Sequence, residues 1–290
     1  MPTYVYLQEF FEAYYLPLRL RARSTNTIRL YRHSVRSFGR YLDRPAELKD
    51  LTDDVVSAYL AWLVSRKLSP YTVNKERSQL LAIWNYAARK GHVSTFPDVQ
   101  HERVPQRVPQ AWTHDELSRL IDACRGQSGT VSGIPASDWW VAIHRVIWDT
   151  AERIGAVLQL TWRGYQAPWL LIPAETRKGR REDKLLKLGQ DTQAALERIR
   201  TPRRKPIFPW GRCPTSLYYE YGQILRRAGL PDDGRCKFHR MRRSVASYYE
   251  AAGGNATELL GHTSRRTTRS YLDPRIVTTT NPCDVLGRLR

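Results

Sequence analysis

A polar, proline-containing stretch divides this sequence into two parts. Residues 101–110 read His-Glu-Arg-Val-Pro-Gln-Arg-Val-Pro-Gln and offer almost no side chain to a hydrophobic core. Because proline lacks the amide hydrogen that helices and sheets use, the stretch is predicted to be an extended linker. A chain of 290 residues is long enough for two domains with separate cores. We therefore expect one unit over residues 1–100, a linker over 101–111 and a second unit over 112–290.

The part before the linker has the periodicity of a helical bundle. Apolar side chains recur at steps of three and four after Ser24, which predicts an amphipathic helix of about 16 residues. Thr52 and Ser69 precede two further stretches of this kind, and Pro70 occupies a first-turn position that helices accept. With a short helix over residues 6–16, the first unit is expected to contain four helices.

The part after the linker is predicted to be mostly helical with one small antiparallel sheet. Thr113 and Glu116 have the spacing of a capping box at the start of a helix. Two β-like segments, residues 169–173 and 184–188, flank a basic, turn-like stretch, so they predict a hairpin with a basic tip. Helical patterns then continue to residue 271. The expected fold class is therefore mainly α, with a mixed α/β second unit.

Positive charge is the strongest signal in the composition. Forty-seven Lys and Arg residues against 28 Asp and Glu residues leave a net charge of +19, and the surplus occurs on both sides of the linker. A compact protein tolerates such self-repulsion mainly when it binds a polyanion, and nucleic acid is the obvious one. We expect neither a membrane span nor a secretory signal, because there is no run of about 18 apolar residues and no basic segment leading into an apolar core near Met1.

The four cysteines do not indicate a metal site or a disulfide framework. Cys124, Cys213, Cys236 and Cys283 show no Cys-x-x-Cys spacing. Cys213, Cys236 and His239 form a conceivable ligand group, but their spacing fits no standard site and a fourth ligand is lacking. We expect no metal and a reducing, cytosolic setting.

One helix face of the first unit carries a row of arginines. Helical spacing places Arg29, Arg32, Arg36 and Arg40 on the side away from the apolar stripe. A row of this kind is often only a solvated face. Here no acidic residue lies between positions 25 and 42, so contact with phosphates is an equal alternative.

The most informative residues of the second unit lie near its end. The helix predicted to stop at Gly253 places His239 and Arg242 on the same side of its first turn. The N-terminus of that helix adds partial positive charge where an anion would dock. The tripeptide Leu-Gly-His ends at His262, and Tyr271 stands nine positions later. Each residue alone is usually structural, and their order is what points to a site.

This order resembles the catalytic signature of the tyrosine recombinases, the phage-integrase family that includes the Xer-type enzymes. The segment Thr-Ala-Glu-Arg-Ile-Gly resembles the family segment with its first active-site arginine, which assigns Arg153. The hairpin tip Lys-Gly-Arg-Arg lies where the family keeps a catalytic lysine, which assigns Lys178. The first unit resembles the family's core-binding domain in Leu51-Thr-Asp-Asp-Val and Ser69-Pro-Tyr-Thr-Val. The resemblance covers essentially the whole chain.

The resemblance implies a fold and a reaction. The expected fold is a SAM-like helical core-binding domain followed by a mixed α/β catalytic domain of the DNA breaking-rejoining type. The implied activity is site-specific DNA recombination or integration through a 3′-phosphotyrosyl intermediate, without a metal, ATP or another cofactor. The residues assigned to the catalytic site are Arg153, Lys178, His239, Arg242, His262 and Tyr271.

These residue types suit that chemistry. When a phenol attacks a phosphodiester, extra negative charge develops on the non-bridging oxygens. Arg153 and Arg242 can clamp those oxygens, and His262 can donate a further hydrogen bond. A free tyrosine has a pKa of about 10, so the cations must favour the phenolate, and His239 is placed to assist its proton loss. Lys178 corresponds to the family's general acid for the leaving 5′-oxygen.

Several positions depart from the family pattern. The family commonly has Gly-Leu-Arg at the first arginine, where this chain has Ala151-Glu152-Arg153. The family commonly has an acidic residue three positions after the first arginine, where this chain has Ala156, and Glu152 is a conceivable substitute. Arg243 stands where the family often has a histidine. Ala156 supports one alternative, a DNA-binding relative whose activity is weakened or lost. A type IB topoisomerase is a second alternative with similar residues, but the short helical first unit and the Leu-Gly-His motif argue against it.

The resemblance also implies partners and a cellular setting. Double-stranded DNA is the expected partner, with a homotetramer on two recombination sites, or an assembly that includes a related recombinase. The expected location is the bacterial cytoplasm, at the nucleoid, and prophages, transposons and other mobile genetic elements use this chemistry. The candidate DNA-binding residues are Arg29, Arg32, Arg36, Arg40, Lys75, Arg180 and Arg181.

Overall fold

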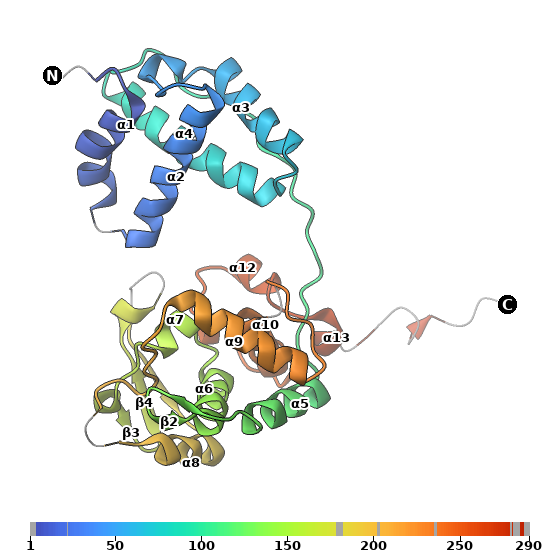
Figure 1. Cartoon of the computed structure of the whole chain (residues 1–290). Helices are drawn as coiled ribbons and strands as arrows, with labels where there is room; N and C mark the ends of the chain where they lie inside the picture. Colours follow the sequence, from blue (N-terminus) through green and yellow to red (C-terminus); the bar gives the residue numbers. More distant parts are fainter. Residues whose placement is uncertain are drawn as a thin grey trace. The chain divides into compact units, whose positions relative to one another are not determined.

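The chain folds into two compact units, residues 1–106 and residues 107–290 (Figure 1). The computed structural model describes residues 4–21, 23–177, 182–201, 204–234, 237–278, 280 and 285–286. Each unit has its own cluster of buried apolar side chains. The division between the units lies within the segment expected to be a linker. None of the described helices combines the length and apolar character that a membrane crossing requires.

The first unit is a helical bundle, as the sequence predicts. Ser24, Thr52 and Ser69 each accept a hydrogen bond from the backbone amide three positions later, which confirms the three predicted helix starts. The predicted short first helix extends further than expected, because a π-helical segment that includes Pro17 continues it to Leu20. The elements are α1 (Leu7–Phe10), η1 (Phe11–Leu20), α2 (Thr25–Tyr41), η2 (Leu48–Asp50), α3 (Asp53–Ser65) and α4 (Pro70–Arg89).

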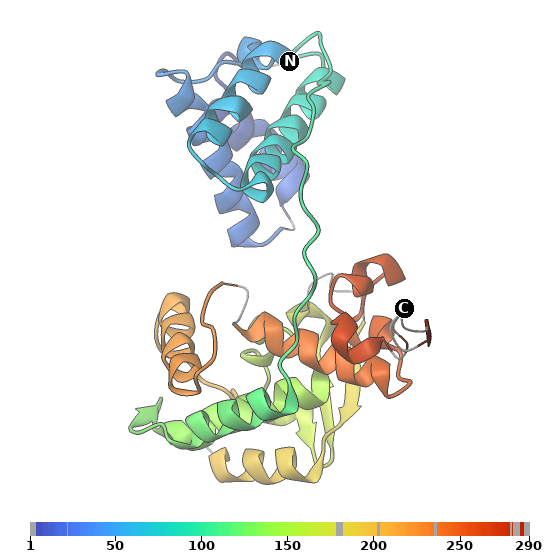
Figure 2. The ribbon, with the colours of Figure 1, turned by 90° about the vertical axis from the view of Figure 1, so that its right-hand side faces the viewer.

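The second unit is mainly helical and surrounds a large aromatic core. Its longer helices are α5 (His114–Arg125), α6 (Ala136–Thr150), α8 (Gln190–Ile199), α9 (Pro214–Arg227) and α10 (Phe238–Ala251). Thr113 and Glu116 form the predicted capping box at the start of α5. Helix α6 packs against both α5 and α8 (Figure 2) and buries Trp139 and Trp140. Burial of such large rings is the main source of stability in a core of this kind.

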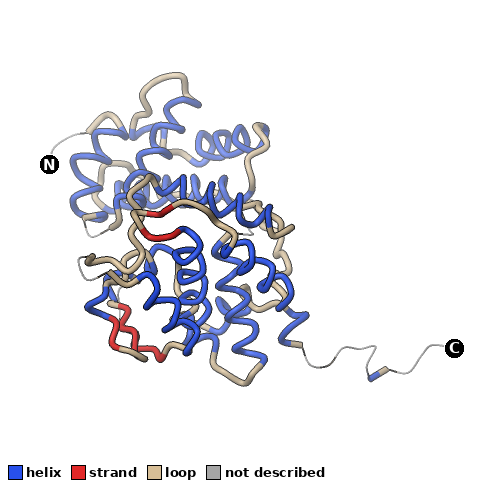
Figure 3. The backbone as a smooth tube through the Cα atoms, turned by 60° about the horizontal axis from the view of Figure 1, so that its bottom comes forward, coloured by secondary structure: helices blue, strands red, loops and turns tan. Residues whose placement is uncertain are grey.

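The described part of the second unit contains two small antiparallel sheets (Figure 3). The predicted hairpin is present: β4 (Trp169–Ile172) pairs with β5 (Lys184–Lys187), and β3 (Tyr165–Gln166) adds a third strand. The register places Ile172 opposite Lys184 at the end of the sheet nearest the hairpin tip. A second hairpin, β1 (Thr130–Val131) with β2 (Ile134–Pro135), was not expected from the sequence.

Short helices close the described part of the chain: α11 (Ala256–Leu260) and α13 (Pro274–Val277) pack on α10, and α12 (Arg265–Arg269) packs on α11. Earlier in the chain, the short helix α7 (Ile154–Val157) packs on α6 and is followed by the 3-10 turns η3 (Trp162–Gly164) and η4 (Ala174–Thr176). A separate apolar cluster joins Ala151, Val245 and Leu260, with Tyr271 packed against it. This cluster brings the segment after α6, helix α10 and the segment after α11 to one place.

Candidate active site

The first predicted site residue, Arg153, lies at a sharp reversal of the chain after α6. Ala151 adopts a left-handed conformation (φ 53°), and Arg153 is the N-cap residue of α7. Between them, Glu152 is buried, with 2% of its surface exposed, whereas Arg153 is partly exposed. The reversal thus turns a carboxylate into the protein and leaves the neighbouring arginine accessible.

Arg242, on α10, is almost completely buried, at 1% exposure. Its Nη1 donates to the carbonyl oxygen of Ala151, and its Nη2 donates to the carbonyl oxygen of Leu260 at 2.8 Å. Among the described residues, its Nε has no hydrogen-bond partner. Burial, followed by the nearby guanidinium of Arg153, lowers the pKa of Arg242 to about 10. The side chain therefore remains a cation at neutral pH.

His262 and Tyr271 come together through the turns around α12. The Nδ1 atom of His262 lies 3.2 Å from the hydroxyl of Thr268, while its buried Nε2 has no partner within the described part of the chain. The amide of Tyr271 donates to the carbonyl of Thr268 at 2.8 Å. The two rings face each other edge-on, with centroids 4.8 Å apart. If the Thr268 hydroxyl donates to Nδ1, Nε2 carries the proton of the neutral ring and is a donor.

The Tyr271 ring also contacts residues of α10. The centroid of the His239 ring lies 4.9 Å from that of Tyr271, and the guanidinium carbon of Arg242 lies 5.9 Å from the same ring. The structure thus brings His239, Arg242, His262 and Tyr271 together although they come from three segments. Arg153 contributes to the same electrostatic environment, since its charge acts on both histidines.

Both histidines are neutral at pH 7 in this environment. Desolvation, followed by the guanidinium groups of Arg243, Arg242 and Arg153, lowers the pKa of His239 to about 4. Desolvation and the charges of Arg242 and Arg153 lower the pKa of His262 to about 4 as well. A neutral imidazole can accept a proton, but His239 becomes an effective base only when a bound phosphate offsets the nearby guanidinium charges and raises its pKa again.

Glu152, which the sequence indicates only as a conceivable substitute for the missing acidic residue, is the centre of a buried charge network. Its Oε1 lies 2.9 Å from Nε of Arg177 and 3.7 Å from Nζ of Lys184, and its Oε2 lies 3.7 Å from Nη1 of Arg242. Lys184 Nζ also donates to the carbonyl oxygens of Thr150 and Leu259. Burial lowers the pKa of Lys184 to about 8. The only sequence signal for these partners was the density of basic residues around the hairpin tip.

The predicted catalytic lysine, Lys178, lies outside the described residues, as do Arg180 and Arg181. The last described residue before them is Arg177, which is held against Glu152. The role assigned to Lys178 therefore stays a prediction.

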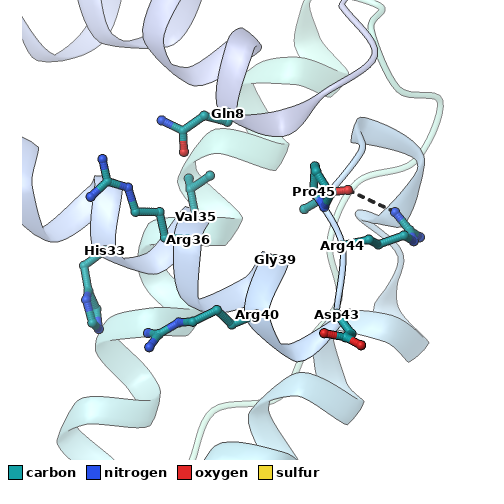
Figure 4. A pocket seen from close by; sticks show the side chains of 10 residues that line it. Gln8, His33, Val35, Arg36, Gly39, Arg40, Asp43, Arg44 and Pro45 are labelled. Carbon is teal, nitrogen blue, oxygen red and sulfur yellow. Dashed lines mark hydrogen bonds between the residues drawn. The ribbon is translucent and has the colours of Figure 1, made fainter.

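The four arginines of the predicted row on α2 differ in their contacts. Arg32 makes two hydrogen bonds to the carboxylate of Glu12, at 2.7 and 2.8 Å, and Arg29 donates to Asn26 at 2.9 Å. Arg36 and Arg40 are exposed and extend to the same side of α2 (Figure 4). Both line an open depression of about 850 Å³. Arg29 is exposed as well, but it is bonded to Asn26, whereas no side-chain hydrogen bond of Arg36 or Arg40 occurs among those of the described residues.

Two further sequence expectations concern Lys75 and metal binding. The ammonium of Lys75 pairs with the buried carboxylate of the adjacent Glu76. No group of three or more metal-ligating side chains exists among the described residues. Cys236 lies outside them.

Comparison of the sequence with known families and proteins gives consistent matches. Residues 8–91 match the family described as the phage integrase N-terminal SAM-like domain. The chain is 25% identical over 266 residues to a tyrosine recombinase of Thermosipho africanus, covering 87% of this chain and 90% of that protein. It is 26% identical over 285 residues to the tyrosine recombinase XerC of Neisseria meningitidis, covering 90% and 89%.

The fold is similar to those of solved DNA complexes. A lambda integrase dimer bound to a COC′ core site superimposes with a TM-score of 0.70 at 18% identity, over 94% of this chain and 79% of that one. The XerH site-specific recombinase in a post-cleavage complex with palindromic difH substrate gives a TM-score of 0.66 at 18% identity, over 87% and 77%. These matches span both units of the chain.

Proposed function

The chain belongs to the tyrosine recombinase family, and we propose that it is a site-specific recombinase that cleaves and rejoins DNA with Tyr271 as nucleophile. The observation that carries this proposal is the position of the Tyr271 ring. It lies beside His239, His262 and the guanidinium of Arg242, the groups that its attack on a phosphodiester requires.

Two buried nitrogens support an anion position in front of Tyr271. Within the described residues, Nε of Arg242 and Nε2 of His262 are buried and have no hydrogen-bond partner. Buried donors without partners are rare, because leaving them unsatisfied costs free energy. The non-bridging oxygens of a scissile phosphate would accept from both, and Arg153 would add a second guanidinium.

The proposed reaction is a transfer of a phosphodiester bond. The Oη atom of Tyr271 attacks phosphorus and gives its proton to neutral His239, while the bond from phosphorus to the 5′-oxygen breaks. Lys178 would supply the proton that the 5′-oxygen needs. The product is a 3′-phosphotyrosyl bond and a free 5′-hydroxyl, so the bond energy is retained. A second 5′-hydroxyl can attack the new bond, and rejoining needs no ATP.

Duplex DNA is the proposed partner, and exchange between two duplexes requires more than one protomer. We propose four protomers on two recombination sites. Lambda integrase has been solved as a tetramer on a Holliday junction, and its fold is similar to that of this chain, with a TM-score of 0.69.

A nicked suicide duplex tests the proposed activity. The cognate site is first selected from a pool of random duplexes by its binding to the full chain. A nick close to the cleavage point lets the short 5′-hydroxyl fragment diffuse away, so the covalent intermediate accumulates. We expect an SDS-resistant adduct on the 3′ end of the cleaved strand. A duplex that is bound but never cleaved would contradict the proposed activity and favour a DNA-binding relative without catalysis.

DNA affinity is expected to depend steeply on salt because of the net charge of +19. Each phosphate that the protein neutralises releases counterions, so contact with 6–10 phosphates lowers the affinity by about 10³–10⁵ between 50 and 200 mM salt. The measurement is a titration of labelled duplex at several salt concentrations. Replacement of both Arg36 and Arg40 by alanine should make the slope shallower by about two ions. The matched control is Arg125→Ala, whose side chain pairs with Asp122 in the second unit. A flat salt response would contradict an electrostatic duplex contact.

A further inference from the structure

We infer that Glu152 is a positioning residue of the active site: its buried carboxylate fixes Arg242 and Arg177, a task for which position 156 offers no acidic side chain. This inference rests on the proposed function. It concerns a residue beside the first arginine, whereas the family pattern commonly has its acid three positions after that arginine.

The guanidinium of Arg242 lies near a second positive charge. Arg242 and Arg153 are close enough for the charge of one to lower the pKa of the other. Two guanidinium groups in a buried place repel each other unless an anion lies nearby. Among the ion pairs of the described residues, Glu152 is the only carboxylate within reach of Arg242, at 3.7 Å. Ala156 is buried, at 3% exposure, and carries no charge.

Glu152 lies on one side of the guanidinium of Arg242. The carboxylate oxygen lies on the Nη1 side, where Nη1 also donates to the carbonyl of Ala151. Nη2 is held separately by the carbonyl of Leu260. Each terminal nitrogen carries two N–H groups, so a further acceptor can still bind there, whereas the single N–H of Nε has no partner in the described part of the chain. The position of Glu152 on the Nη1 side favours the orientation in which Nε can donate to the phosphate.

Glu152 also contacts the hairpin. Arg177 donates from Nε to Glu152 at 2.9 Å, and it directly precedes the predicted catalytic lysine, Lys178. Gly261 makes room for this arginine: a Cβ atom there would lie 2.6 Å from Nη2 of Arg177. One carboxylate therefore links the end of the hairpin, the turn before His262 and Arg242.

Replacement of Glu152 by glutamine tests the inference, because the amide keeps the shape and removes the charge. Cleavage is measured in single turnover on two suicide duplexes, one with the natural scissile phosphodiester and one with a methylphosphonate there. On the phosphodiester we expect the Glu152→Gln rate to fall about 100-fold, the loss typical of one misplaced donor. DNA affinity should be unchanged. Glu197→Gln, an exposed carboxylate paired with Arg200, is the matched control.

The methylphosphonate separates positioning from a general structural role. It lacks one of the charged oxygens that the guanidinium groups neutralise, so a misplaced Arg242 matters less. We expect the ratio of wild-type to Glu152→Gln rates to shrink at least tenfold on this substrate. Equal losses on both duplexes, or no loss on either, would overturn the inference.

A second variant keeps the test decisive if the glutamine variant does not fold. Glu152→Asp retains the charge but shortens the side chain by one methylene group. Its cleavage rate should fall less than that of Glu152→Gln, and the fall should again be larger on the phosphodiester than on the methylphosphonate. Wild-type protein that forms no adduct on a bound site would overturn the proposed function and this inference with it. If wild-type protein forms the adduct, and each variant loses the same factor in cleavage rate on both duplexes, the inference alone is overturned.

Discussion

Replacement of Tyr271 by phenylalanine is expected to abolish the covalent adduct on the suicide duplex and to leave DNA affinity unchanged. The substitution removes one oxygen atom and keeps the ring, which is partly buried and packs edge-on against His239 and His262. Once that oxygen is absent, position 271 has no nucleophile with which to form a 3′-phosphotyrosyl bond. The measurements are a denaturing gel for the adduct and a mobility shift for binding.

Tyr249→Phe is the matched control for this prediction. Tyr249 also belongs to the second unit, on α10, but its side chain is exposed and packs near Gly254. This variant should form the adduct at the wild-type rate. Adduct formation by the Tyr271→Phe protein would show that another residue is the nucleophile, and peptide mapping of the adduct would then identify it.

The helices of both units were predictable because their signals are local. Ser24, Thr52, Ser69 and Thr113 each cap a helix through a contact with a residue only three positions away. The hairpin of β4 and β5 was predictable for the same reason, since its strands are close in sequence. The strands β1 and β2 are two residues long, too short for an alternating pattern to show.

The identities of the site residues were predictable, but their partners were not. The order of Arg153, His239, Arg242, His262 and Tyr271 is a sequence property, and the structure brings the last four into contact. Which charges neutralise one another depends on contacts between distant segments. The ion pair of Arg32 with Glu12 spans 20 positions between two helices, so the row of α2 appeared free of acidic neighbours when only its own helix was considered.

The partners of Glu152 were also not predictable from the sequence. Its partners Arg177 and Lys184 lie on the hairpin, and Arg242 lies on α10, 90 positions later in the chain. Periodicity places a residue on a face of its own element, but it does not say what another element places opposite. A buried carboxylate must have cationic or hydrogen-bonding partners, so only the predicted burial of Glu152 would have revealed that such partners exist.

Replacement of the two arginines of the proposed phosphate clamp should affect the stability of the protein differently, although both arginines share a catalytic role. Arg242→Ala and Arg153→Ala are each expected to lower the cleavage rate by about 10²–10³, the loss for one transition-state donor. Arg242→Ala should also lower the free energy of unfolding of the second unit by about 1–3 kcal/mol, because buried acceptors then lose a donor, while Glu152 keeps Arg177 and Lys184 as cationic partners. These acceptors are the backbone carbonyls of Ala151 and Leu260.

Arg153→Ala should change that free energy by less than about 1 kcal/mol, since a partly exposed charge contributes little to stability. No ion pair of Arg153 occurs among those of the described residues. Urea unfolding followed by tryptophan fluorescence measures the stabilities, and the suicide duplex measures the rates. Equal destabilisation by both variants would contradict the buried role of Arg242. An Arg242→Ala protein that is as stable as wild type and cleaves at the wild-type rate would contradict both proposed roles of Arg242. It would show that this side chain neither supports the reversal after α6 nor binds the phosphate.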